Sequence, residues 1–139
     1  MRALVFLLAM STSAVALTAQ ADSTLVVKVL NVQEARGELL VALYDDPADW
    51  NKPELAKYTR IVSATTGRVD VDFAHLAPGR YAVAVLHDRD SNGVMTTMMG
   101  LPREPYGFGN DARGIFGPPT YEQSLITFDG RGSTKVTIK

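Results

Sequence analysis

Short runs in which apolar and polar residues alternate recur through most of this chain, and turn-forming residues separate them. The clearest run is 68–73, where Val69, Val71 and Phe73 alternate with charged residues. Successive side chains of a β-strand point to opposite faces, so this pattern predicts a half-buried strand. Similar runs occupy residues 25–30, 39–43, 58–64, 81–87, 123–128 and 134–138. The sequence therefore predicts an all-β fold, a sandwich of about seven antiparallel strands.

The segments between these runs indicate how the strands connect. Residues 31–37 follow the first run and residues 129–132 precede the last, and each segment predicts a hairpin. Residues 76–81 carry Pro at the second turn position and Gly at the third, which predicts a type II turn. Residues 46–57 have the composition of a short helix, because Pro47 suits the first helical position.

The first 21 residues have the pattern of a secretory signal peptide. Arg2 precedes an apolar run over 3–10, and Ala19 and Ala21 form an A-x-A-like cleavage site. The apolar stretch falls short of the roughly 20 residues of a membrane span, although an uncleaved anchor is the alternative. We expect cleavage after Ala21 and a single domain over 22–139, secreted or periplasmic and without a membrane span.

Composition narrows the kinds of site that the chain can hold. It has no cysteine, which excludes disulfides, thiolate metal sites and a cysteine nucleophile. Its 14 basic and 15 acidic residues are interleaved, with a net charge of −1. This pattern gives no indication of a nucleic-acid footprint or a polybasic membrane patch.

Residues 88–93 match the first half of a calcium-binding loop. Asp88, Asp90 and Asn92 place side-chain oxygens at the first, third and fifth positions, and Gly93 suits the sharp turn that follows. The alternative is an Asx-rich turn in which the same side chains accept hydrogen bonds from backbone amides. Calcium is therefore the candidate cofactor.

The second half of the calcium pattern is incomplete. Val94 would offer its carbonyl and Thr96 a hydroxyl or a bound water, but Met99 stands where such a loop has a bidentate glutamate. Glu104 or Glu122 would have to supply that carboxylate from elsewhere in the fold. We therefore expect weak calcium binding at most.

The longest stretch without a strand pattern is residues 88–121, which we call the flap. A loop of this length in a compact domain is usually functional or disordered, and the apolar residues within this one favour a structured segment. Aromatic rings interleaved with polar residues are a common composition of binding sites, and the alternative is that the rings fasten the flap to the sandwich. The candidate ligand-binding residues are Arg103, Glu104, Tyr106, Phe108, Asn110, Arg113, Phe116 and Tyr121.

Four segments, in this order and spacing, carry a resemblance to a known family. They are Pro78-Gly79-x-Tyr81, His87-Asp88-x-Asp90-x-Asn92-Gly93, Gly100-Leu101-Pro102-x-Glu104-x-Tyr106-Gly107-Phe108-x-Asn110 and Phe116-Gly117-Pro118-Pro119-x-Tyr121. The combination resembles DUF2141, a bacterial family of small exported proteins of unknown function. Residues 76–81 also resemble the turn-strand unit of transthyretin-like and carboxypeptidase-regulatory-like sandwiches. The resemblance implies a secreted or periplasmic sandwich and transfers no catalytic residue.

Three functions remain open from the sequence. The favoured one is a non-catalytic module that binds a small molecule, a peptide or an envelope partner through the flap. A hydrolase-like enzyme using His87, Asp88 and Asp90 is the alternative, with His87 as a weak catalytic candidate, and a structural envelope component is the third. Trp50 is expected to plug one end of the sandwich.

Overall fold

The computed structural model describes residues 23–139, so the expected signal peptide over 1–21 and its cleavage point lie outside the described residues. The strands are β1 (Thr24–Val32), β2 (Glu38–Tyr44), β3 (Tyr58–Ser63), β4 (Gly67–Ala74), β5 (Gly79–Asp88), β6 (Thr97–Met98), β7 (Leu101–Pro102), β8 (Tyr106–Phe108), β9 (Leu125–Phe128) and β10 (Arg131–Thr137). Four short 3-10 helices connect them: η1 (Pro47–Asp49), η2 (Pro53–Leu55), η3 (Gly109–Asp111) and η4 (Glu122–Ser124).

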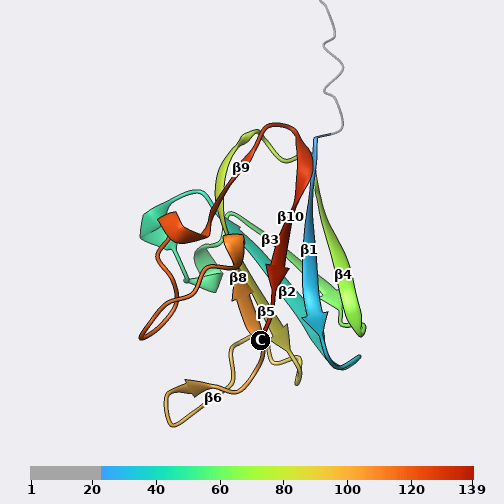
Figure 1. The fold of residues 1–139 in the computed structure, drawn as a ribbon, viewed down its shortest axis with the longest axis vertical. Helices are drawn as coiled ribbons and strands as arrows, with labels where there is room; N and C mark the ends of the chain where they lie inside the picture. Colours follow the sequence, from blue (N-terminus) through green and yellow to red (C-terminus); the bar gives the residue numbers. More distant parts are fainter. Residues whose placement is uncertain (1–22) are drawn as a thin grey trace, which may run out of the picture.

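These strands form two facing sheets and one small hairpin. A three-stranded sheet has the order β10-β1-β4, and a larger sheet has the order β3-β2-β5-β8, with β9 also paired to β5 (Figure 1). β6 and β7 pair only with each other, within the flap. The β1–β10 pair is parallel and the other described pairs are antiparallel. The predicted all-β sandwich is therefore confirmed, with ten strands in place of about seven.

The alternation in the sequence places the core between the two sheets. Val71 and Phe73 of β4 are 1% exposed, and the intervening Asp72 is exposed. Every second residue of β1, β2 and β5 is likewise buried. Apolar burial of this kind is the main stabilising contribution in a chain without disulfides. The core residues of these strands are Leu25, Val27, Val29, Leu39, Val41, Leu43, Tyr81, Val83 and Val85.

Both predicted hairpins are wrong. β1 pairs with β4 and β10, whereas β2 pairs with β3 and β5, so residues 31–37 cross from one sheet to the other. Residues 129–130 also connect the two sheets, because β9 pairs with β5 and β10 pairs with β1. Each of these connections therefore joins strands in facing sheets rather than paired strands.

Two local predictions also need correction. Gly79 does not have the positive φ that a type II turn requires at that position. The chain turns instead at His75, with a φ of 58°, and the Tyr81 hydroxyl donates a 2.6 Å hydrogen bond to the Ala77 carbonyl. Residues 46–57 form the two 3-10 turns η1 and η2 in place of a helix, although Asp46 does cap η1 through its side chain.

A third layer covers the outer face of the larger sheet. Trp50, from the segment between η1 and η2, contacts Tyr44 edge-on at 5.2 Å between ring centroids and Phe108 at 5.7 Å. Trp50 therefore lies on the outer face of the sheet and fastens β2 to β8, rather than plugging an end of the core. Among residues 23–139, no helix is long and apolar enough to cross a membrane.

Candidate functional site

The flap begins with a carboxylate that the fold buries completely. Asp88, the last residue of β5, is 0% exposed. Its two carboxylate oxygens accept backbone hydrogen bonds from Asn92 at 3.2 Å and Gly93 at 2.6 Å. The Asp90 carboxylate accepts from the Asn92 backbone and side chain at 3.3 and 3.1 Å. The predicted Asx-rich turn is therefore present.

A second buried carboxylate reaches this turn from the far side of the β6–β7 hairpin. Glu104 is 6% exposed, and it accepts hydrogen bonds from the backbone amides of Arg89 at 2.8 Å and Thr96 at 2.9 Å. Ligand oxygens of Asp88, Asp90 and Glu104 all lie within 4.8 Å of one another. We refer to these three side chains as the carboxylate cluster.

The charge of this cluster is not balanced by a nearby cation of the chain. Within residues 23–139, none of its carboxylates makes an ion pair with a basic side chain, and Arg89 instead pairs with Glu34 at 3.6 Å. Like charges at this separation repel, and burial strengthens the repulsion. Backbone N–H groups offset part of it, and a bound cation would offset more.

The structure separates the candidate calcium ligands. Glu104 supplies a carboxylate close to Asp88, whereas Glu122 lies in η4 and is not part of the cluster. The Thr96 hydroxyl lies 3.3 Å from Asp90 Oδ2, to which it donates a hydrogen bond. The Val94 amide donates to the Asn92 side chain at 3.0 Å, which keeps that residue within the turn.

His87 lies apart from the carboxylates. It is 0% exposed, and its Nε2 is 2.8 Å from the Arg36 carbonyl. Because successive residues of a strand point to opposite faces, His87 points toward the core and Asp88 away from it. The structure therefore does not bring together the His87, Asp88 and Asp90 set of the hydrolase alternative.

A groove lies between the flap and the outer face of the larger sheet. Its floor consists of outward side chains of β2 and β5, namely Leu40, Ala42, Ala84 and Leu86. Tyr106 and Phe108 extend the floor, because β8 pairs with β5 opposite Leu86 and Ala84. We call this feature the apolar groove.

The flap and the η1–η2 segment form the walls of the apolar groove. The outer part is an open space of about 620 Å³, and the part against the floor has a volume of about 130 Å³. Asn51, Met95, Tyr106 and Phe108 border both parts. Among the described residues that line either part, no side chain is charged.

Other predicted ligand-binding residues have different places. Asn110 adopts a φ of 59° and ties the flap to the η4–β9 segment, donating from Nδ2 to the carbonyls of Gln123 at 3.2 Å and Leu125 at 2.6 Å. Tyr121 contacts Trp50 edge-on at 6.1 Å. Phe116 is fully exposed at the end of its loop. Of the predicted set, Asn110 and Tyr121 thus fasten the flap, and Tyr106, Phe108 and Phe116 border the groove. Glu104 belongs to the carboxylate cluster, and Arg103 and Arg113 are exposed outside the groove lining.

One family model matches most of the chain. The family model described as an uncharacterized protein conserved in bacteria, DUF2141, matches residues 27–137. The chain belongs to the DUF2141 family. No curated protein matches it, and no solved structure does. The likeness to transthyretin-like sandwiches therefore stays a prediction.

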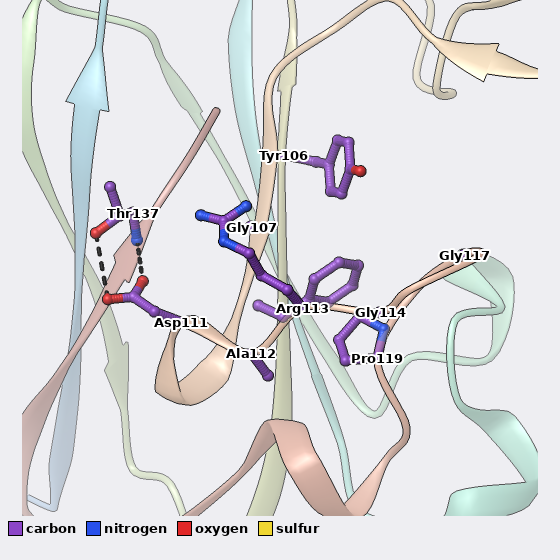
Figure 2. Close-up of a pocket in the computed structure, with 10 residues that line it drawn as sticks. Tyr106, Gly107, Asp111, Ala112, Arg113, Gly114, Gly117, Pro119 and Thr137 are labelled. Atoms are coloured by element: carbon purple, nitrogen blue, oxygen red, sulfur yellow. Dashed lines mark hydrogen bonds between the residues drawn. The ribbon is translucent and has the colours of Figure 1, made fainter.

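In this DUF2141 protein, the match spans the carboxylate cluster, the apolar groove and a small pocket on the other side of the flap. Figure 2 shows this pocket of about 80 Å³, where the Asp111 carboxylate accepts hydrogen bonds from the Thr137 amide at 2.6 Å and hydroxyl at 3.3 Å. Arg113 extends across Gly107 in the same view. These contacts attach the flap to β10.

The groove floor of this DUF2141 protein was not predicted from the sequence. Leu40 and Ala42 occupy the face of β2 that points away from the core, so both faces of that strand are apolar. A strand with two apolar faces is typically covered on both sides. That signal was available in residues 39–43 and would have indicated a third layer.

Proposed function

We propose that this protein is an exported binding module that takes a small, mostly hydrocarbon ligand in the apolar groove. The observation that carries the proposal is the uncharged lining of a space of about 620 Å³. Pockets for small molecules typically enclose about 300–1,000 Å³ and combine apolar walls with few polar groups. Burying apolar ligand surface against such walls is favourable by about 25 cal/mol per Å².

The few polar groups at the groove restrict the ligand further. Asn51 offers the side-chain amide, and Tyr44 and Tyr106 carry hydroxyls. Burial raises the pKa of Tyr44, and the nearby Glu54 carboxylate raises it further, so this phenol stays neutral at physiological pH. An uncharged or weakly polar ligand suits this lining better than an ion.

A neutral fluorescent dye tests the groove. Nile red should bind the protein, and its binding should quench Trp50, the sole tryptophan of the chain, which contacts the groove residue Phe108. Met95→Glu should weaken binding by roughly tenfold or more, because it introduces a charge into an apolar site. Ser133→Glu places the same charge on the exposed part of β10 and should bind as the wild type does. Equal binding by Met95→Glu would place the dye elsewhere.

We propose calcium binding by the carboxylate cluster as a second function. The convergence of Glu104 with Asp88 and Asp90 supports it, because Glu104 brings the acidic oxygen that the loop itself lacks. Calcium takes six to eight oxygen ligands, of which three carboxylates supply only part. The expected dissociation constant is about 0.1 to 1 mM, in the range of extracellular modules.

Thermal melting distinguishes a calcium site from a purely structural turn. With these constants, about 10 mM calcium should raise the free energy of unfolding by roughly 1.4 to 2.7 kcal/mol relative to a chelator. Asp90→Asn should reduce this effect and change the calcium-free stability little, since Asp90 is exposed. Asp72→Asn removes an equal charge from β4 and should leave the calcium effect intact. Melting that does not respond to calcium would identify the cluster as a turn only.

Export is part of the proposal and rests on the pattern of residues 1–21. Ala19 and Ala21 place small side chains where signal peptidase requires them. The intact mass of the protein recovered from the periplasm or medium should correspond to a chain that begins at Asp22. A protein that keeps Met1 to Ala21 in the cell envelope would indicate an uncleaved anchor.

A further inference from the structure

Two loops of the flap expose large apolar side chains, three of them almost completely. We call residues 93–103 and 112–119 the tip loops. Exposed apolar residues that stand singly are normal, but a group of them on neighbouring loops marks an interaction surface. The exposed fractions are Met99 96%, Phe116 102%, Ile115 89%, Leu101 68%, Val94 60% and Met98 53%.

The backbone of the first tip loop makes its apolar residue unusual. Met99 and Gly100 form the two-residue connection between β6 and β7, with φ values of 53° and 76°. Hairpin turns with two positive φ angles favour Asn, Asp or Gly at these positions. A methionine here strains the backbone, and strained residues often mark functional sites. The stability of the turn therefore does not explain why a methionine occupies position 99.

The two tip loops lie on one side of the molecule. Leu101 from the first loop and Phe116 from the second both border the outer part of the apolar groove. Both loops project from the sandwich on the side away from β1 and β4 (Figure 1). One flat or fluid surface can therefore contact both at once.

The charges of the tip loops differ from those of the rest of the chain. Neither loop contains an acidic residue, and each has one arginine at its base, Arg103 or Arg113, both exposed. The chain as a whole carries a net charge of −1. The apolar tips are thus accompanied by positive charge, which complements an anionic surface.

We propose that the tip loops dock the protein on a phospholipid surface that contains anionic lipids. Met99, Leu101 and Phe116 reach into the acyl boundary, and the two arginines contact headgroup phosphates. Protruding side chains with almost no protein neighbours suit fluid acyl chains, which conform to them, whereas a folded partner would need a matching pocket for each. This docking goes beyond ligand binding in the groove and does not require it.

Vesicle sedimentation tests the proposal, with a chelator present so that calcium takes no part. The protein should bind vesicles of equal phosphatidylcholine and phosphatidylglycerol more tightly than vesicles of phosphatidylcholine alone. Phe116→Ser should lower the partition coefficient by about tenfold, since the docked protein loses an apolar side chain that would lie among the acyl chains. Arg113→Gln should lower it by about fivefold on the anionic vesicles only.

Met99→Asn separates docking from folding. Asparagine suits the positive φ at this position, so the melting temperature should stay the same or rise while vesicle binding falls. Ile61→Ser is the matched control, because Ile61 is 57% exposed on β3, outside both loops, and its loss should not affect binding.

Three results would overturn docking. One is a wild-type protein that binds neither kind of vesicle. Another is a Met99→Asn or Phe116→Ser variant that binds as the wild type does. The third is a dimer in the absence of lipid that Phe116→Ser dissociates, because the tips would then pair two copies of the chain.

Nile red binding is measured on the same variants, and Met99 and Met98 lie outside the groove lining. Loss of docking by Met99→Asn with intact dye binding therefore separates the two proposals.

Discussion

The indole Nε1 of Trp50 donates a 2.9 Å hydrogen bond to the carbonyl oxygen of Pro119, which joins positions 69 residues apart. Pro119 is buried in the returning arm of the flap, and Trp50 contacts the groove residue Phe108. This bond therefore holds the flap over the outer face of the larger sheet.

Trp50→Phe should loosen the flap without unfolding the sandwich. The ring contacts largely persist while one hydrogen bond is lost, so unfolding should require about 1 kcal/mol less free energy. Hydrogen exchange of the backbone amides over 112–120 should accelerate. Tyr121→Phe keeps its ring against Trp50 and should change stability by less than about 0.5 kcal/mol. Unchanged exchange over 112–120 would mean that other contacts hold the flap.

Gly37 lies against the backbone at the start of the flap, so any side chain added at position 37 would clash with that backbone. A Cβ at Gly37 would meet the Asp88 carbonyl and lie 2.7 Å from the Arg89 Cα, and its φ is +72°. Gly67 also has a positive φ, +97°, but a Cβ added there would have no neighbouring atom within 4 Å.

Gly67→Ala should therefore cost only the backbone strain, about 1–2 kcal/mol of stability. Gly37→Ala should cost about 3 kcal/mol or more, because the strain and the clash add. Chemical denaturation of both variants gives the comparison. Equal losses would show that the β1–β2 connection shifts away from Asp88 without cost.

The strand register of β4 predicts the cost of truncating neighbouring residues. Phe73 is buried in the core, so Phe73→Ala should lower the free energy of unfolding by about 3–5 kcal/mol. Asp72 is exposed, and Asp72→Ala should change stability by less than about 0.5 kcal/mol. Denaturant unfolding measures both. A larger loss for Asp72→Ala would mean a register shifted by one residue.

Three phenols whose pKa is raised should make the fold sensitive to high pH. Burial raises the pKa of Tyr44, Tyr81 and Tyr121 above the ordinary value of 10.0. Above this value the unfolded chain loses phenol protons that the folded chain retains, so stability should fall as the pH rises through that range. Phenolate absorbance of the folded protein should show a late-titrating set. Tyr81→Phe should make the loss of stability less steep, and a folded protein whose tyrosines all titrate together near 10 would contradict the prediction.

Local patterns were sufficient for the seven strands outside the flap, but they did not predict β6, β7 and β8 within it. Alternation in residues 68–73 reports which face of a strand is apolar, and that information is contained in the strand itself. The Asx-rich turn over 88–93 was also predictable, because its hydrogen bonds join residues at most five apart. These features can be predicted without knowing which strands pair with each other.

Strand partners and the candidate site depended on the tertiary structure. Residues 31–37 are compatible with a hairpin, yet β1 and β2 lie in opposite sheets, because each pairs with strands that are distant in sequence. From the sequence, either Glu104 or Glu122 could have supplied the missing carboxylate. Glu104 lies beside Asp88 because β6 and β7 fold back on each other.

The sequence alone determined that this chain forms β-strands with a long aromatic insert, because alternation and turn residues act over a few positions. Only the tertiary structure decided that the outer faces of β2, β5 and β8 meet the insert in one groove. Side chains such as Leu40 and Met95 are far apart in sequence, and their place in one groove follows from packing, which local propensity does not encode.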